Sequence, residues 1–233
     1  MSDQWSVLLT GPILDPQPWQ QAALDAGWKS INHPLLKRAA LPLGDTAIEV
    51  PDWIAVTSSG AVDALVRARD TGAVWCHSAL AAVGLGTAAA LEKRGFKVSA
   101  TAPEGNASSL AKVLIQEATK GARILWLRGE RARDLGDELR EAQFTVDERI
   151  VYRTEPAISD PAPLTDVVFF AAPEAVELWC RQDHSFRPAA LAIGWTTLDA
   201  LLTNQNQFSL TLPLASPEPE SLGLALGAIA ANQ

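Results

Sequence analysis

Small hydroxyl residues and glycines follow apolar runs at three places in the sequence. Thr57-Ser58-Ser59-Gly60 comes directly after Trp53-Ile54-Ala55-Val56, and the pairs Gly86-Thr87 and Thr196-Thr197 follow two further apolar stretches. If each run is a strand and a helix follows it, open backbone N–H groups at the helix start stabilise a carboxylate or phosphate. A plain helix N-cap is the alternative interpretation at each place. The pattern favours binding of an anionic small molecule.

A glycine-rich motif resembles a dinucleotide-binding turn only in part. Gly84-x-Gly86-x-x-Ala89 follows an apolar run, and Glu104 lies further along the chain, as the ribose-binding acid of that motif does. The motif is expected after the first strand of a nucleotide-binding domain, and the run before it is short and rich in alanine. We therefore favour a structural turn over a site for NAD.

Tyr152 is the only tyrosine of the chain and lies in a segment that we expect to be extended. Its side chain either faces a site or is a packed aromatic. Arg128, Arg131 and Arg133 follow another apolar run. They face either an anion or solvent, and we favour solvent.

Other residues that carry chemistry show no useful spacing. Cys76 and Cys180 are far apart and form no CxxC motif, so buried free thiols are expected. The three histidines form no metal-binding pattern, and no Ser-His-Asp or Cys-His arrangement is visible. We expect neither a metal nor a cofactor.

Length and charge exclude several classes of protein. The chain has 233 residues, of which 48% are hydrophobic and 20% charged, and a formal net charge of −8. An acidic chain without clustered Lys and Arg is a poor ligand for nucleic acid or for an anionic membrane surface. The N-terminal residues lack the pattern of a signal peptide, which favours a cytoplasmic protein.

Apolar runs alternate with helical stretches along the chain, as in α/β proteins. We expect strands at 7–9, 53–56, 124–127 and 167–170, and helices near 19–26, from 61, and through Leu135 and Leu139. The strands are apolar throughout rather than alternating, which is typical of a parallel sheet covered on both faces.

An internal repeat divides the sequence. Residues 52–62 match 166–176, 83–91 match 193–201, and the run at 7–9 corresponds to that at 124–127. We therefore expect two similar α/β domains with a ligand in the cleft between them. Two connectors, at 29–36 and 145–154, are either sheet strands or a hinge. The sequence leaves open whether the first strand of each repeat packs with its own repeat or with the other.

In combination, these residues resemble the uroporphyrinogen-III synthase family over nearly the whole chain. The matching motifs, quoted from this sequence, are Thr10-Gly11-Pro12, 52–62, 82–87 with Leu91 and Gly95, 125–129 with Arg133 and Leu139, 151–154, 168–176, and 192–197 with Leu201.

The resemblance implies two flavodoxin-like parallel-sheet domains joined by a two-stranded linker. Domain 1 would comprise residues 1–32 and 158–233, domain 2 residues 45–144, and the linker strands residues 33–44 and 145–157. The implied activity is a cofactor-independent cyclising lyase that converts hydroxymethylbilane, a linear tetrapyrrole, with inversion of ring D and loss of water. A monomer is expected, with a transient contact with hydroxymethylbilane synthase.

By position, the resemblance assigns to Tyr152 a helping role in departure of the substrate hydroxyl. It implies substrate contacts from Thr57, Ser58, Ser59, Gly60, Ala61, Gly86, Thr87, Ala172, Pro173, Glu174, Ala175, Thr196 and Thr197.

The sequence departs from the family pattern at three places. Gly11 replaces an arginine, Gln143 replaces a glycine, and Ala171-Ala172-Pro173-Glu174 lacks two hydroxyls and adds an acid beside an expected carboxylate site. The synthase is the favoured interpretation. Glu174 and the two lost hydroxyls support the alternative, a catalytically weak or inactive two-domain small-molecule binding protein of the same fold.

Overall fold

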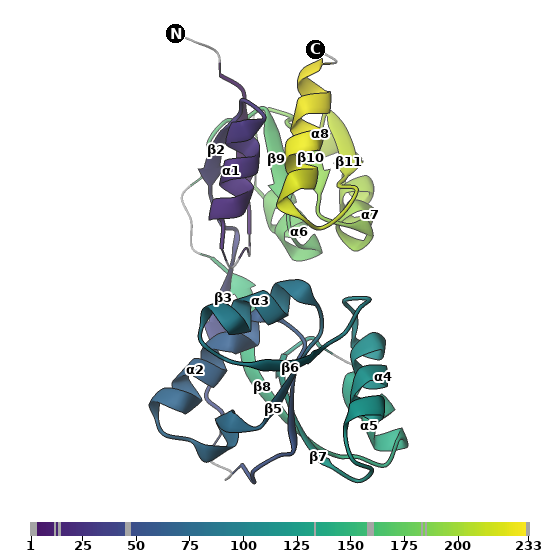
Figure 1. Cartoon of the computed structure of the whole chain (residues 1–233). Coiled ribbons are helices and arrows are strands. Elements are labelled where there is room, and N and C mark those ends of the chain that lie inside the picture. Colours follow the sequence, from purple (N-terminus) through teal and green to yellow (C-terminus); the bar gives the residue numbers. More distant parts are fainter. Residues whose placement is uncertain are drawn as a thin grey trace. The chain divides into compact units, whose positions relative to one another are not determined.

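The computed structural model describes residues 4–231 except 12, 14, 45–47, 133, 158–160, 183 and 185, so Pro12 and Arg133 lie outside the described residues. The chain divides into two compact units (Figure 1). We call them unit 1, Met1–Lys37 with Glu155–Gln233, and unit 2, Arg38–Thr154. Each contains a sheet with helices on both faces, which confirms the predicted α/β class with two domains of similar architecture.

Unit 1 is built on a five-stranded sheet with the order β11-β10-β9-β1-β2, in which all neighbouring strands are parallel. Its strands are β1 (Ser6–Leu9), β2 (Lys29–Asn32), β9 (Val167–Phe170), β10 (Ala189–Ala192) and β11 (Leu210–Pro213). Helices α1 (Gln17–Asp25) and α8 (Pro219–Ala231) pack on one face, and α6 (Pro173–Cys180) and α7 (Trp195–Thr203) pack on the other. A short 3-10 helix, η3 (Gln205–Gln207), follows α7.

Unit 2 is built on a six-stranded sheet with the order β3-β8-β7-β4-β5-β6. The strands are β3 (Leu36–Ala40), β4 (Trp53–Val56), β5 (Ala79–Ala82), β6 (Val98–Thr101), β7 (Arg123–Gly129) and β8 (Thr145–Pro156). One face is covered by η1 (Ser59–Ala61), α2 (Val62–Asp70), η2 (Val74–His77) and α3 (Leu85–Lys93). The other is covered by α4 (Ala107–Glu117) and α5 (Leu135–Glu141).

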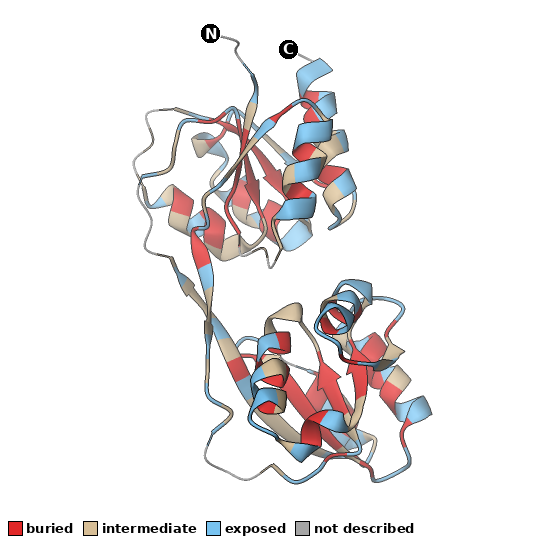
Figure 2. Ribbon diagram, turned by 60° about the vertical axis from the view of Figure 1, so that its left-hand side comes forward, coloured by how far each residue is buried: buried red, intermediate tan, exposed pale blue. Residues whose placement is uncertain are grey.

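The central strands are buried over most of their length, as Figure 2 shows by their colour. In β9 and β10 every residue is buried, which explains why these segments are continuous apolar runs. The helices are buried only on the side that faces the sheet (Figure 2). The prediction of parallel sheets covered on both faces is therefore confirmed for the other strand pairs, while the hydrogen bonds between β3 and β8 run in the antiparallel sense.

The expected helix near 19–26 begins slightly earlier, at Gln17, because Pro18 is tolerated in the first helical turn. It ends at Asp25, just before Gly27, whose φ of +82° allows its N–H and that of Trp28 to bond back to the carbonyls of Leu24 and Ala23. Within the described residues, no helix has both the length and the apolar character needed to cross a membrane.

Both connectors form sheet strands. Residues 29–36 become β2 and the start of β3, and residues 145–154 lie within β8, which neighbours β3 and β7. The chain passes from unit 1 to unit 2 within β3 and returns within β8. The domain limits derived from the resemblance stay a prediction.

The first strand of each repeat packs with the other repeat. β1 lies between β2 and β9, and β7 lies between β8 and β4. Matching aspartates hold these pairs together: the carboxylate of Asp166 accepts the Ser6 N–H at 2.8 Å, and that of Asp52 accepts the Arg123 N–H at 2.7 Å. Packing between repeats is the alternative that the structure supports.

We expect Asp166→Ala to lower the free energy of unfolding by about 1 kcal/mol, because charge-assisted hydrogen bonds that tie β1 to β9 are lost at a water-exposed position. Chemical denaturation followed by tryptophan fluorescence measures this. Asp70→Ala, which removes an exposed carboxylate 3.9 Å from Arg69, is the control and should change the value by less than about 0.5 kcal/mol. Equal stability of the two variants would contradict the role assigned to Asp166.

Candidate functional site

The carboxyl end of the unit 2 sheet brings together several of the predicted site residues. β4, β5, β7 and β8 are parallel where they pair, so the residues that follow them share one edge. Residues 57–61 follow β4, Gly86 and Thr87 follow β5, and Gly129 ends β7. Tyr152, on β8, lies opposite Gly129 in the strand register.

The ring of Tyr152 packs against two glycines. A Cβ atom built on Gly60 would lie 2.9 Å from its Cζ atom, and one built on Gly129 would lie 2.6 Å from it. The Arg38 guanidinium carbon lies 5.9 Å from the ring centroid. Tyr152 is half-buried at the border of the core under α2 and α3, so it is both a packed aromatic and a residue of this edge.

The turn after β4 is held by its own side chains. Ser58 Oγ accepts the Gly60 N–H at 3.1 Å, and Thr57 Oγ1 accepts the indole N–H of Trp126 at 3.1 Å. The plain N-cap interpretation is therefore correct for Ser58. Ala61 is fully buried, so only its backbone can contribute to a site.

Several helices start at the carboxyl edges of the sheets without a side-chain cap, and three of them contain predicted site residues in their first turn. These three are α3 after Gly84 in unit 2, and α6 after Ala172 and α7 after Gly194 in unit 1. The first N–H groups of a helix have no partner within it, so an anion can satisfy them. Of the predicted residues here, Gly86 and Thr196 are exposed.

Two predicted hydroxyl donors and one predicted alanine are buried instead. Thr87 is 8% and Thr197 1% exposed, because their side chains belong to the helix face that packs inward, and Ala175 is fully buried. Their side chains therefore do not line an open surface. Ala172, Pro173 and Glu174 are partly exposed at the start of α6.

Of the two glycines in the motif at 84–89, Gly84 has a structural explanation. A Cβ on Gly84 would lie 3.1 Å from the Cα of Gly105, whereas one on Gly86 would meet nothing within 4 Å. The motif also follows β5, which lies between β4 and β6 rather than opening the domain. The structural turn is thus the better interpretation.

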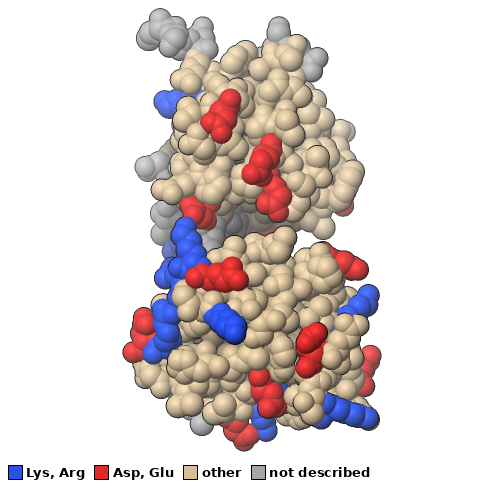
Figure 3. Space-filling view, viewed as in Figure 1, with Lys and Arg blue, Asp and Glu red and all other residues tan. Residues whose placement is uncertain are grey.

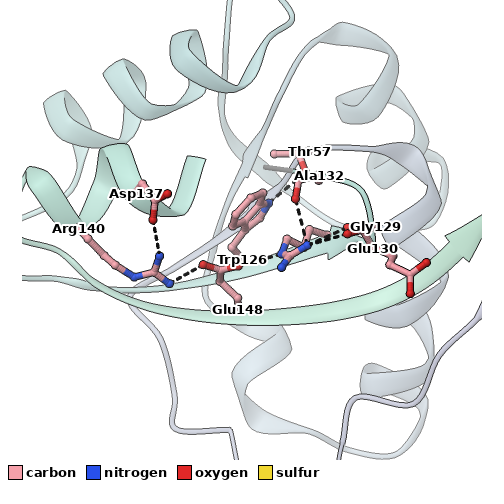
Figure 4. A network of polar contacts seen from close by, with 9 residues as sticks. Thr57, Trp126, Gly129, Glu130, Ala132, Asp137, Arg140 and Glu148 are labelled. Atoms are coloured by element: carbon pink, nitrogen blue, oxygen red, sulfur yellow. Dashed lines mark hydrogen bonds and ion pairs between the residues drawn. The ribbon is translucent and has the colours of Figure 1, made fainter. Parts of the chain in front are cut away.

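Arg128 does not point into solvent, so the favoured interpretation of this residue was wrong. Its Nε donates to Glu148 at 2.9 Å, and its Nη1 donates to the carbonyls of Gly129, Glu130 and Ala132 at 3.0 to 3.2 Å (Figure 4). Three backbone carbonyls and one carboxylate take the place of water around most of this guanidinium. Arg131 is exposed, and Arg133 lies outside the described residues.

Glu148 also binds Arg140, which in turn donates to Asp137 at 3.1 Å (Figure 4). The hydrogen bond to Glu148 raises the pKa of Arg140 above its ordinary value. Sequence reasoning missed Glu148, since an acid in the middle of a strand carries no signal of its partners.

Two exposed apolar side chains were also missed. Leu85 and Trp195 are the first residues of α3 and α7, and they are 82% and 75% exposed. They occupy matching positions in the repeat, which is the signal that was available in the sequence. Each lies beside an uncapped helix start.

The thiols are poor nucleophiles. Cys76 is buried, as expected, whereas Cys180 is only partly buried at the end of α6. Burial nevertheless raises the pKa of the Cys180 thiol to about 11. Among the described residues no group of His, Cys, Asp and Glu has a metal-binding arrangement.

Gly129→Ala should displace the Tyr152 ring and lower the free energy of unfolding by about 1–3 kcal/mol, the usual cost of overpacking. The single tyrosine can be labelled with 3-fluorotyrosine, so one ¹⁹F resonance reports the ring. Gly227→Ala is the control, because its Cβ would meet nothing within 4 Å. An unmoved resonance in Gly129→Ala would show that the ring does not depend on this contact.

Cys180 should react slowly with iodoacetamide at about pH 8, since its thiol stays protonated there. A thiol whose pKa is raised by folding stabilises the protein below its ordinary pKa of 9.0, and this contribution is lost as the pH rises toward about 11. The reaction in denaturant is the reference. Equal rates in the folded and unfolded chain would contradict the prediction.

The comparisons with known proteins agree with this architecture. A family model described as uroporphyrinogen-III synthase HemD matches residues 17–219. The chain is similar to the solved uroporphyrinogen-III synthetase from Helicobacter pylori, with 17% identity, a TM-score of 0.70, and coverage of 97% of this chain and 99% of that one. It is also similar to a mutant uroporphyrinogen III synthase from Thermus thermophilus, with 18% identity, a TM-score of 0.55, and coverage of 98% and 100%.

At these identities the solved structures show a shared fold, whereas the family model covers most of the chain. The resemblance stated from the sequence is confirmed. The chain belongs to the uroporphyrinogen-III synthase family, whose members are cofactor-independent lyases that cyclise hydroxymethylbilane.

Proposed function

We propose that this chain cyclises hydroxymethylbilane to the type III isomer with Tyr152 and with the turns at the carboxyl edges of its two sheets. The observation that supports these site residues is the packing of Tyr152 beside the turn at 57–61 and Gly129. The substrate contacts are proposed to lie in the turns at 57–61, 86–87, 172–175 and 196–197. The N–H groups of Gly60, Ala61, Thr87 and Ala175 already donate within the protein, so the main donors are those of the exposed Gly86 and Thr196 at the starts of α3 and α7.

The linear substrate can lose its hydroxyl and cyclise without an enzyme. Loss of the hydroxyl from ring A gives an azafulvene, and without an enzyme the bilane closes to the type I isomer. For type III, ring D attacks through its substituted carbon, and the spiro intermediate fragments and recloses with ring D inverted. The protein therefore contributes mainly orientation, which selects one closure.

Tyr152 assists the first step. Its phenol donates a hydrogen bond to the departing hydroxyl, which leaves as water once a proton has been transferred. When the ring closes, the pyrrole carbon that forms the new bond loses a proton, which replaces the one used to release the hydroxyl as water. Because the hydroxyl also leaves spontaneously, this residue accelerates the step rather than making it possible.

The backbone N–H groups at the starts of α3 and α7 bind substrate carboxylates. A net charge of −8 opposes a polyanionic substrate, and on the face shown in Figure 3 acidic residues are interspersed with basic ones. The attraction of the local N–H donors for the substrate carboxylates must therefore exceed the repulsion from the net negative charge of the protein. α6 contributes less, because Pro173 has no N–H and Glu174 adds an acid in its first turn.

Leu85 and Trp195 provide apolar contact for the pyrrole rings. Both are exposed beside uncapped helix starts, so one ring and its carboxylates can be bound at neighbouring positions. Trp195 offers the larger surface, since an indole stacks on aromatic rings.

A monomer in the cytoplasm is the form that we propose for the active protein. A transient contact with hydroxymethylbilane synthase fits the chemistry, since the free bilane closes to the wrong isomer. The alternative, an inactive binding protein, rests on the segment Ala171-Ala172-Pro173-Glu174 and is not favoured by the family match.

An isomer assay tests the proposal. Hydroxymethylbilane is generated in situ by its synthase, and the products are oxidised and separated by chromatography. We expect type III to dominate with this protein and type I without it. A folded protein that yields only type I would overturn the proposal and favour the inactive binding protein.

Tyr152→Phe should lower kcat about tenfold and retain type III selectivity, because the general acid assists a step that also occurs spontaneously. Thr203→Val removes an exposed hydroxyl at the end of α7 and should leave kcat unchanged. Full turnover by Tyr152→Phe would remove the role assigned to the phenol.

A further inference from the structure

The turn after β7 is fixed by a single side chain. Arg128 Nη1 donates to the carbonyls of Gly129, Glu130 and Ala132, at 3.2, 3.2 and 3.0 Å. Within the turn, the Ala132 N–H donates to the Gly129 carbonyl at 3.1 Å. Glu148 accepts from Arg128 Nε at 2.9 Å and so sets the plane of the guanidinium. The side chain of Arg128 is 18% exposed.

The same group reaches the turn after β4. The Arg128 guanidinium carbon lies 5.2 Å from the centroid of the Trp126 ring, and the Trp126 indole donates to Thr57 Oγ1 at 3.1 Å (Figure 4). Trp126 is 2% exposed in the core under α4 and α5. One connected set of contacts therefore links both turns.

Tyr152 packs against one glycine of each turn, and its own strand is adjusted to place it there. The register between β7 and β8 shifts after Arg128, which pairs with Ile150, so that Gly129 pairs with Tyr152. Such a bulge changes the direction of a side chain. The Glu130 N–H then donates to the Tyr152 carbonyl at 3.1 Å.

We propose that Arg128 is a positioning residue for the reaction, which holds the turns on both sides of Tyr152 and thereby sets the place of its phenol. Arg128 belongs with Trp126 on the sheet face covered by α4 and α5, while the Tyr152 ring borders the core of the opposite face. Arg128 acts through backbone. The inference rests on the proposed role of Tyr152.

Lysine cannot replace this arginine. A guanidinium offers donors in a fixed plane, which here bind a carboxylate on one side and three carbonyls on another. An ammonium keeps the charge but lacks that fork. Arg128→Lys therefore separates the geometry of the residue from its charge.

The first test follows the ring directly. In protein labelled with 3-fluorotyrosine, Arg128→Lys should move or split the single ¹⁹F resonance. Arg123→Lys is the matched control. Arg123 lies at the other end of β7 and pairs with Glu49 at 2.6 Å, so the ¹⁹F resonance of Tyr152 should not move in this variant. An unmoved resonance in folded Arg128→Lys overturns the inference.

If Arg128→Lys does not fold, the same measurement is made on Glu148→Gln. This substitution keeps the size of the side chain at 148 and weakens the hydrogen bond that orients the Arg128 guanidinium. The resonance should then move in the same direction by a smaller amount. An unmoved resonance in Glu148→Gln would then overturn the inference.

The second test is kinetic. Arg128→Lys should lower kcat about fivefold and change KM less than about twofold, because a displaced catalytic group costs rate rather than binding. In the Tyr152→Phe background the same change should lower kcat less than about twofold, since coupled residues are not additive. Equal losses of kcat in the wild-type and Tyr152→Phe backgrounds overturn the inference. A rise in KM without a change in kcat also overturns it, and would make Arg128 a ligand of a substrate carboxylate.

The two tests separate this inference from the proposed function. If the wild-type protein yields no type III product, the proposed function fails, and the ¹⁹F measurement still decides whether Arg128 positions Tyr152. If type III forms and the resonance is unmoved, only the inference fails.

Discussion

Parallel pairing between strands of different repeats is the constraint on which the rest of the structure depends. β1 pairs with β9, and β7 pairs with β4, and in each case an aspartate of one repeat accepts the backbone N–H of the first residue in the strand from the other. A parallel pair needs a crossover connection rather than a short hairpin. All of unit 2 lies in the sequence between β1 and β9, so the chain crosses to unit 2 and returns. The same pairing aligns the strand ends, and the turns that follow them share one edge of each sheet.

In the site that we propose, backbone groups rather than charged side chains bind the substrate carboxylates. Thr87 and Thr197 are buried, while the helix starts beside them are uncapped. Helix N–H groups carry no counterion and stay where the fold holds them, so they cost little to organise. Their effect is local, which suits a substrate whose several carboxylates meet the protein at separate points.

Close packing fixes the one side chain to which we assign chemistry. The Tyr152 ring occupies space that a Cβ atom would fill on either Gly60 or Gly129. Both glycines belong to turns held by the contacts of Arg128, Trp126 and Thr57. The phenol therefore depends on residues that it does not touch.

The alternation of strands and helices, the two similar domains and the family followed from the sequence alone, because apolar runs, turn residues and the repeat are local signals. The turn at 57–60 and Tyr152 were found in the same way. The apolar pattern left the strand exchange open, since both pairings satisfy it; the family resemblance implied packing between the repeats, and the tertiary structure shows it. The tertiary structure decided that Arg128 is enclosed, because the partners of a guanidinium come from residues distant in the chain. Burial of Thr87 was likewise a matter of how its helix rotates against the sheet.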